Sequence, residues 1–232
     1  MRLNLNKFGF LLTLIFSVST FSYAQTPAQI TDFAKAAKFD DVSVVKSLLT
    51  KGVNPNAVDT NGNPMLILAI KDRSNNVIDL LLKDPKIDVD LSNKSGETPL
   101  MMASIDGNLP LVKTLVLQNK ALIDHISWTP LHYACAKGHL EVAQFLIANG
   151  AIVDSMSLGN TTPLMMAVQS GNEQLVKLLL DKGADMQIRN AQGLTAIDIA
   201  DIYDKPWISE GLRSRWLKLY KKPYIGPVKP KA

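Results

Sequence analysis

Apolar and polar positions recur along this chain with a period close to 33 residues. Two identical hexapeptides, residues 98–103 and 162–167, read Thr-Pro-Leu-Met-Met-Ala, and residues 129–134 between them read Thr-Pro-Leu-His-Tyr-Ala. With the first position of this motif as a marker, six units begin at Thr31, Pro64, Thr98, Thr129, Thr162 and Thr195, spaced by 33, 34, 31, 33 and 33 residues. Self-similarity at such a period predicts a solenoid of stacked units.

The fourth unit indicates that each repeat forms a pair of helices. Thr129 suits the N-cap of a first helix, and Pro130 suits its first position, where no amide donor is needed and φ is already set. Gly138 permits a tight turn into a second helix, and Gly150 can adopt the left-handed conformation that ends it. The second helix is apolar around most of its circumference, so it should lie between neighbouring helices. The pattern predicts an all-α fold.

The repeated unit resembles the ankyrin repeat, whose Thr-Pro-Leu-His-x-Ala motif recurs with this period. The resemblance covers about residues 29–217 and includes glycines at 52, 107, 138, 150, 171 and 183. It implies an ankyrin-type α-solenoid of about six helix-turn-helix units with projecting finger loops, in a domain over residues 25–219. In ankyrin-like proteins the first helices and the fingers form a concave groove, which implies a partner protein bound there.

Several units depart from the pattern. The first unit lacks the proline and the histidine, and residues 204–207 replace the glycine turn of the last unit, so both are expected to be caps with one face in water. Arg73 and Pro85 replace the two glycines of the second unit, while the third has Asn119 and a linker to the fourth that is two residues shorter. The sequence leaves the shape of the fingers open at these two places.

An apolar stripe precedes the motif alanine in successive units, at Leu68, Met102, Tyr133, Met166 and Ile199. Leu68 and Ile199 are expected mainly to pack neighbouring helices, whereas the two methionines suit packing and partner binding equally. The candidate partner-binding residues lie on the stripe, on the fingers and at the ends of the first helices: Trp128, Tyr133, Met102, Met166, Leu68, Glu97, Lys71, Asp72, Lys137 and Thr161.

Trp128 and Tyr133 are the sharpest of these candidates, because aromatic anchors contribute a large share of the binding free energy at interfaces. The alternative for Trp128 is packing against the neighbouring finger.

The N-terminal segment reads as a signal peptide over residues 1–24. Arg2 and Lys7 precede an apolar run at 8–18, and small residues then lead to a predicted cleavage between Ala24 and Gln25. The apolar run is shorter than the roughly 20 residues of a membrane span. Gln25 stands where a bacterial lipoprotein has a cysteine. We therefore expect a soluble, monomeric periplasmic protein of a Gram-negative bacterium, with secretion as the alternative.

The single cysteine, Cys135, permits no internal disulfide, so the fold must be held by its core. The net charge of +4 is unevenly distributed: residues 1–24 carry +2, residues 213–232 carry +7, and the body between them carries −5. An acidic body argues against nucleic-acid binding.

The C-terminal residues 220–232 are basic and contain prolines, which predicts disorder from about Lys221. A weak contact with an anionic membrane is a second interpretation of the tail, through Lys218, Lys221, Lys222, Lys229 and Lys231.

The sequence offers little that could support catalysis or cofactor binding. His125, His132 and His139 fall on a finger, a first helix and a turn, so they should diverge rather than share a metal. We find neither a nucleophile with a base and an orienting group nor a phosphate-binding loop, so no enzymatic activity and no cofactor are expected. The preferred hypothesis is non-catalytic protein binding that inhibits, protects or scaffolds a partner. A membrane-surface adaptor and a secreted effector acting on host proteins are the alternatives.

Overall fold

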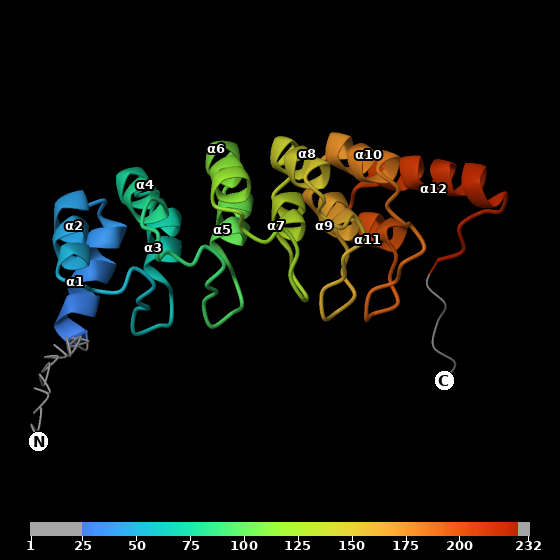
Figure 1. The fold of residues 1–232 in the computed structure, drawn as a ribbon. Helices are drawn as coiled ribbons and strands as arrows, with labels where there is room; N and C mark the ends of the chain where they lie inside the picture. The colour runs from blue at the N-terminus through green and yellow to red at the C-terminus, as the bar shows by residue number, and fades with distance from the viewer. Residues whose placement is uncertain (1–24, 227–232) are drawn as a thin grey trace, which may run out of the picture.

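The computed structural model describes residues 25–226, which form two layers of helices stacked along one axis, with loops projecting from one edge (Figure 1). The inner helices are α1 (Pro27–Lys38), α3 (Met65–Lys71), α5 (Pro99–Ile105), α7 (Pro130–Ala136), α9 (Pro163–Ser170) and α11 (Ala196–Ile202). The outer elements are α2 (Val42–Thr50), α4 (Asn75–Leu82), α6 (Leu109–Lys113) with the π-helical segment η1 (Thr114–Gln118), α8 (Leu140–Ala148), α10 (Glu173–Asp181) and α12 (Pro206–Tyr220).

Each inner helix packs against its own outer helix and against the inner helix of the next unit. The motif alanines Ala69, Ala103, Ala134, Ala167 and Ala200 are fully buried, because only a small side chain lets successive inner helices approach closely. The predicted all-α solenoid of stacked pairs is confirmed. Residues 1–24 and 227–232 lie outside the described residues. They include the predicted signal peptide, Ala24 at its predicted cleavage point, and the tail lysines Lys229 and Lys231. Gln25, on the other side of the predicted cleavage point, is described.

The capping role of the motif threonine is confirmed in four units. The Oγ1 atoms of Thr98, Thr129, Thr162 and Thr195 accept hydrogen bonds from the amide three residues on, at 3.3 to 3.5 Å. Thr31 does not mark a helix start, because it lies inside α1 and Thr26 is the N-cap. The first helix therefore begins about one turn earlier than the repeat register predicts.

Glycine turns behave as the sequence predicts. Gly138 and Gly150 have φ values of 74° and 101°, in the left-handed region that glycine adopts without strain. Arg73 has φ 56° at the turn where the third, fourth and fifth units have glycine, and its guanidinium pairs with Asp106 in the turn of the next unit. The substitution therefore keeps the turn and adds an ion pair between units.

The C-terminal cap differs from the predicted disorder in residues 221–226. Tyr224 is buried, its ring centroid lies 4.9 Å from that of Trp216, and its hydroxyl donates to Asp198. Asp198 stands where the third, fourth and fifth units have methionine or histidine. The folded-back residues 221–226 supply the ring and the hydroxyl that cover this position at the C-terminal end of the described stack.

Candidate functional site

The third finger, residues 121–128, is the place where the repeat changes most. In the other four fingers a tip side chain closes the loop by accepting the amide four residues on, as Asn93 Oδ1 does from Glu97 at 3.1 Å. Five positions separate Asp124 from the capping Thr129, against eight between Asp90 and Thr98. The third finger thus lacks the closed tip. The stretch from Leu109 to Asp124 is one residue longer than the equivalent stretch from Leu140 to Asp154 in the fourth unit, and this stretch contains the π-helical segment η1.

Trp128 ends this short finger and exposes 39% of its surface. Its ring meets those of His132 and Tyr133 edge-on, with centroid separations of 5.2 and 6.1 Å. Such edge-to-face pairs are favourable and hold the indole in one orientation. Trp128 therefore packs against the first helix of the following unit and still presents an open face.

Tyr133 joins Trp128 to the preceding unit. Its hydroxyl donates to Glu97 Oε1 at 3.3 Å, and the Glu97 carboxylate also accepts from Asn93 at 2.8 Å and lies 3.9 Å from Lys71 Nζ. Burial and the nearby Glu97 carboxylate raise the pKa of Tyr133 to about 12, so the phenol stays protonated and remains a donor. The structure thus brings together four of the predicted residues from three successive units.

Not every predicted residue offers a contact surface. Leu68 and Met102 expose only 4% and 5%, which fits the packing role expected for Leu68 and one of the two roles considered for Met102. They are buried because the inner helices lie close together at the motif alanine. Met166 is partly buried, and Thr161 uses its carbonyl to accept from His132 Nε2. Lys71, Asp72 and Lys137 are exposed at the ends of α3 and α7.

The histidines and the cysteine of the fourth unit occupy structural positions. His132 Nε2 bonds to the Thr161 carbonyl, and His139 Nε2 bonds to the Ile105 carbonyl, so these two rings tie separate pairs of units together. Within residues 25–226 no group of three His, Cys, Asp or Glu could hold a metal ion. Cys135 is fully buried, and burial raises the pKa of its thiol above the usual range. Such a thiol is inert as a nucleophile.

Sequence reasoning missed a group of exposed apolar side chains on the third and fourth fingers: Leu122, Ile126, Ile152, Met156 and Leu158. Their exposed fractions run from 52% for Met156 to 97% for Ile126. The signal was available in the repeat register, because Leu122 and Ile152 occupy a position that is Asn54, Asp88 and Asp185 in the other units.

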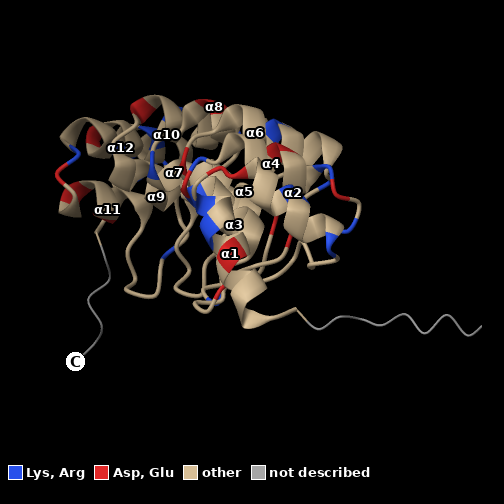
Figure 2. Cartoon of the chain, turned by 90° about the vertical axis from the view of Figure 1, so that its left-hand side faces the viewer, with Lys and Arg blue, Asp and Glu red and all other residues tan. Residues whose placement is uncertain are grey.

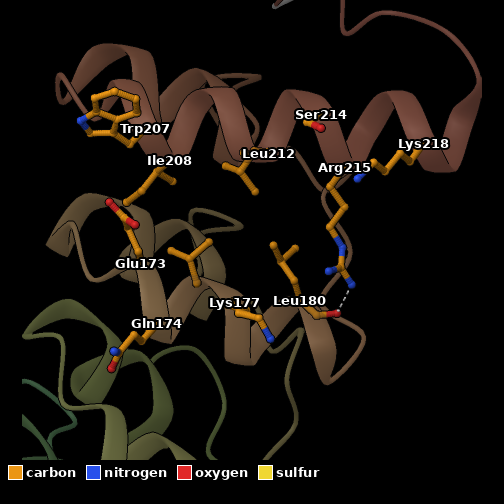
Figure 3. A pocket seen from close by; sticks show the side chains of 12 residues that line it. Glu173, Gln174, Lys177, Leu180, Trp207, Ile208, Leu212, Ser214, Arg215 and Lys218 are labelled. Atoms are coloured by element: carbon orange, nitrogen blue, oxygen red, sulfur yellow. Dashed lines mark hydrogen bonds between the residues drawn. The ribbon is translucent and has the colours of Figure 1, made fainter.

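A groove of about 530 Å³ lies between α10 and α12, at the C-terminal end of the stack (Figure 3). Leu180 and Leu212 line it from opposite sides, and Trp207 stands exposed at one end. At the other end Arg215 donates to the Leu180 carbonyl and pairs with Asp181. The lining is apolar with charged rims, which again suits contact rather than chemistry.

Charged residues of both signs are interspersed over the helices, and no continuous basic face appears in the view of Figure 2. No helix among residues 25–226 is long and apolar enough to cross a membrane.

The family model of ankyrin repeats in three copies matches residues 33–126 and 106–190, which together are well over half of the chain. The chain belongs to the ankyrin repeat family. Ankyrin repeats are generally a non-enzymatic fold for protein–protein interaction, and the inner helices and fingers described above are the surfaces they offer.

Similar proteins include the chicken nuclear factor NF-kappa-B p105 subunit, 32% identical over 81% of this chain and 19% of that protein. The human transient receptor potential cation channel subfamily A member 1 is 28% identical over 71% of this chain and 15% of the channel. The palmitoyltransferase AKR1 of Lachancea kluyveri is 34% identical over 50% of this chain and 16% of the enzyme. The chain spans less than a fifth of the length of each of these relatives.

Proposed function

We propose that this ankyrin repeat protein is a non-catalytic, monomeric protein of the bacterial periplasm that binds a partner protein. The surface proposed is the inner face around the short third finger, where Trp128, Tyr133 and Glu97 meet. The exposed face of Trp128 is the observation that carries the proposal, because a held, partly exposed indole is typical of interface anchors. Export is supported by the charged and apolar pattern of residues 1–24.

The first prediction concerns the double variant Trp128→Ala, Tyr133→Ala. We expect it to weaken capture of the main partner from an envelope extract at least about tenfold, since removing an interface anchor commonly costs more than 1 kcal/mol. Trp207→Ala is the matched control, because Trp207 exposes 75% of its surface at the far end of the stack. Undiminished capture by the double variant, or equal loss with the control, would remove the inner face from the proposal.

A second candidate function is a membrane-surface adaptor, favoured by the exposed side chains near the end of the described chain. Leu217, Leu219 and Ile225 are exposed beside Lys218, Lys221 and Lys222. Apolar side chains interleaved with lysines suit the interface of an anionic bilayer, where each lysine contributes about 1 kcal/mol.

The second prediction tests this adaptor with vesicles of phosphatidylglycerol and of phosphatidylcholine. Replacing the three lysines by Lys218→Gln, Lys221→Asn and Lys222→Gln should abolish sedimentation with the anionic vesicles, while Trp216 and Tyr224 keep the cap folded. Asparagine is chosen at 221 because that residue has φ 56°. If the unaltered protein ignores both vesicles, the adaptor hypothesis is wrong.

A further inference from the structure

Five exposed apolar side chains lie on the adjacent third and fourth fingers, and we name them together the finger patch: Leu122, Ile126, Ile152, Met156 and Leu158. Soluble proteins normally scatter such side chains singly, and a concentration on two adjacent loops marks an interaction site. None of these residues belongs to the cluster of Lys71, Glu97, Trp128 and Tyr133, although Ile126 and Trp128 both flank Ser127.

The repeat register shows that two of these residues give up a local hydrogen bond. Asn54, Asp88 and Asp185 occupy the equivalent position in other units, and their side chains accept the amide two residues on, at 2.8 to 3.0 Å. Leu122 and Ile152 have no acceptor atom, so the third and fourth fingers lack this bond. At these two positions an exposed aliphatic side chain replaces a side chain that forms a hydrogen bond with its own loop. This exchange does not stabilise the isolated loop, which points to a role of the aliphatic side chains in binding.

The patch is held in place by bonds between the fingers. The Leu122 amide donates to Asp90 at 2.9 Å, and the Ile152 amide donates to Asp124 at 3.2 Å. At the end of the short finger the Leu158 amide donates to Ser127 Oγ at 3.3 Å. A partner would therefore meet a surface that is already ordered, which reduces the entropy lost on binding.

The charge beside the patch is negative. Five aspartates at the bases of the fingers accept hydrogen bonds from backbone amides: Asp88, Asp90, Asp124, Asp154 and Asp185. Among the described residues, none of these carboxylates has a lysine or arginine nitrogen within 4.0 Å. Burial raises the pKa of Asp124 and Asp154, and the Asp185 charge adds to the effect on Asp154. Lys120, close in sequence, donates to the Leu117 carbonyl of its own helix end.

We infer that the finger patch docks a partner segment in which aliphatic side chains are interspersed with lysine or arginine. The aliphatic groups cover the exposed side chains, and the cations face the row of aspartates. The same row disfavours an anionic membrane, and it opposes a second copy of this patch, which would place aspartates against aspartates. The inference rests on the proposed function and extends its interface beyond Trp128.

The experiment is a selection of random displayed peptides on the full protein, with the variant Leu122→Asn, Ile152→Asn as the reference. Asparagine is the residue type that forms the finger turn at position 54, so the variant should keep its melting temperature. We expect the enriched peptides to combine aliphatic and basic residues, to bind the variant at least about tenfold more weakly, and to lose affinity as salt rises.

Acidic or uncharged enriched peptides, equal binding to the variant, or no enrichment would each overturn the inference. A concentration-dependent dimer of the unaltered protein that the variant abolishes would assign the patch to a second copy instead, and would also overturn it. The two proposals fail separately. If the captured partner ignores Trp128→Ala with Tyr133→Ala, the proposed function fails; if it needs those residues while peptide binding ignores Leu122 and Ile152, only the finger patch fails.

Discussion

Tyr224→Ala is expected to lower the free energy of unfolding by about 3 kcal/mol, the range for removing a buried aromatic side chain. The Tyr224 ring packs edge-on against Trp216 and lies 5.4 Å below the Arg213 guanidinium. Its hydroxyl donates to Asp198 and lies 2.7 Å from Thr195 Oγ1. Truncation leaves a cavity at the end of the stack and takes a donor away from a buried carboxylate, which adds to the loss.

Urea denaturation followed by circular dichroism measures this loss. Tyr224→Phe is the matched control: it keeps the ring and removes only the hydroxyl, so we expect it to cost about 1 kcal/mol. Hydrogen exchange should place the loosening in α11 and α12, because each repeat contacts only its neighbours. Unchanged stability of Tyr224→Ala would show that the tail does not cap the solenoid in solution.

The second large effect is a loss of stability at acidic pH that depends on His132. Burial lowers the pKa of His132 below its usual 6.5, although the hydrogen bonds around the ring oppose the shift. The Thr129 amide donates to Nδ1 at 3.2 Å, so the neutral ring carries its proton on Nε2 and donates it to the Thr161 carbonyl at 2.9 Å. A second proton, on Nδ1, would face the Thr129 amide hydrogen.

The direction in which stability changes with pH follows from the number of protons that the folded and the unfolded chain bind. Below pH 6.5 the unfolded chain takes up a proton that the folded chain resists, so the free energy of unfolding falls as pH falls through this window. Because a single proton is involved, the fall attributable to His132 is at most about 1.4 kcal/mol per pH unit, and it ends once the folded chain also takes up that proton.

His132→Met is the matched control, because methionine occupies the equivalent position in the third and fifth units, at Met101 and Met165. The Met101 Sδ atom accepts a hydrogen bond from the Thr98 amide at 3.4 Å, as the His132 ring does from the Thr129 amide. Urea midpoints measured from pH 7.5 to pH 5 should fall less steeply for His132→Met. Equal slopes for the two proteins would contradict a neutral, buried His132.

The repeat motif predicted the inner helices well, because Thr129 and Pro130 determine where a helix begins and the motif alanine determines how closely units pack. It misplaced the start of the first helix, since Thr31 matches the register while Thr26 with Gln29 supplies the actual capping box. The spacing of the repeats predicted where the short third finger lies, but it was not used to predict that apolar side chains on the third and fourth fingers are exposed.

Other features could not be predicted from the sequence because they depend on contacts between distant segments. Tyr224 lies in a stretch whose composition suggests disorder, and its order depends on contacts with Trp216 and Asp198. Met102 and Met166 follow the same motif, yet Met102 is buried and Met166 is partly exposed, because the neighbouring units cover them to different extents.

The most direct test of the central claim is the affinity of the identified partner for Trp128→Ala with Tyr133→Ala, measured by calorimetry beside the melting temperature of the same sample. We expect the affinity to fall at least about tenfold while the melting temperature and helical content stay close to those of Trp207→Ala. Unchanged affinity would contradict a binding surface at the short third finger, and a collapsed fold would show that these two side chains belong to the core.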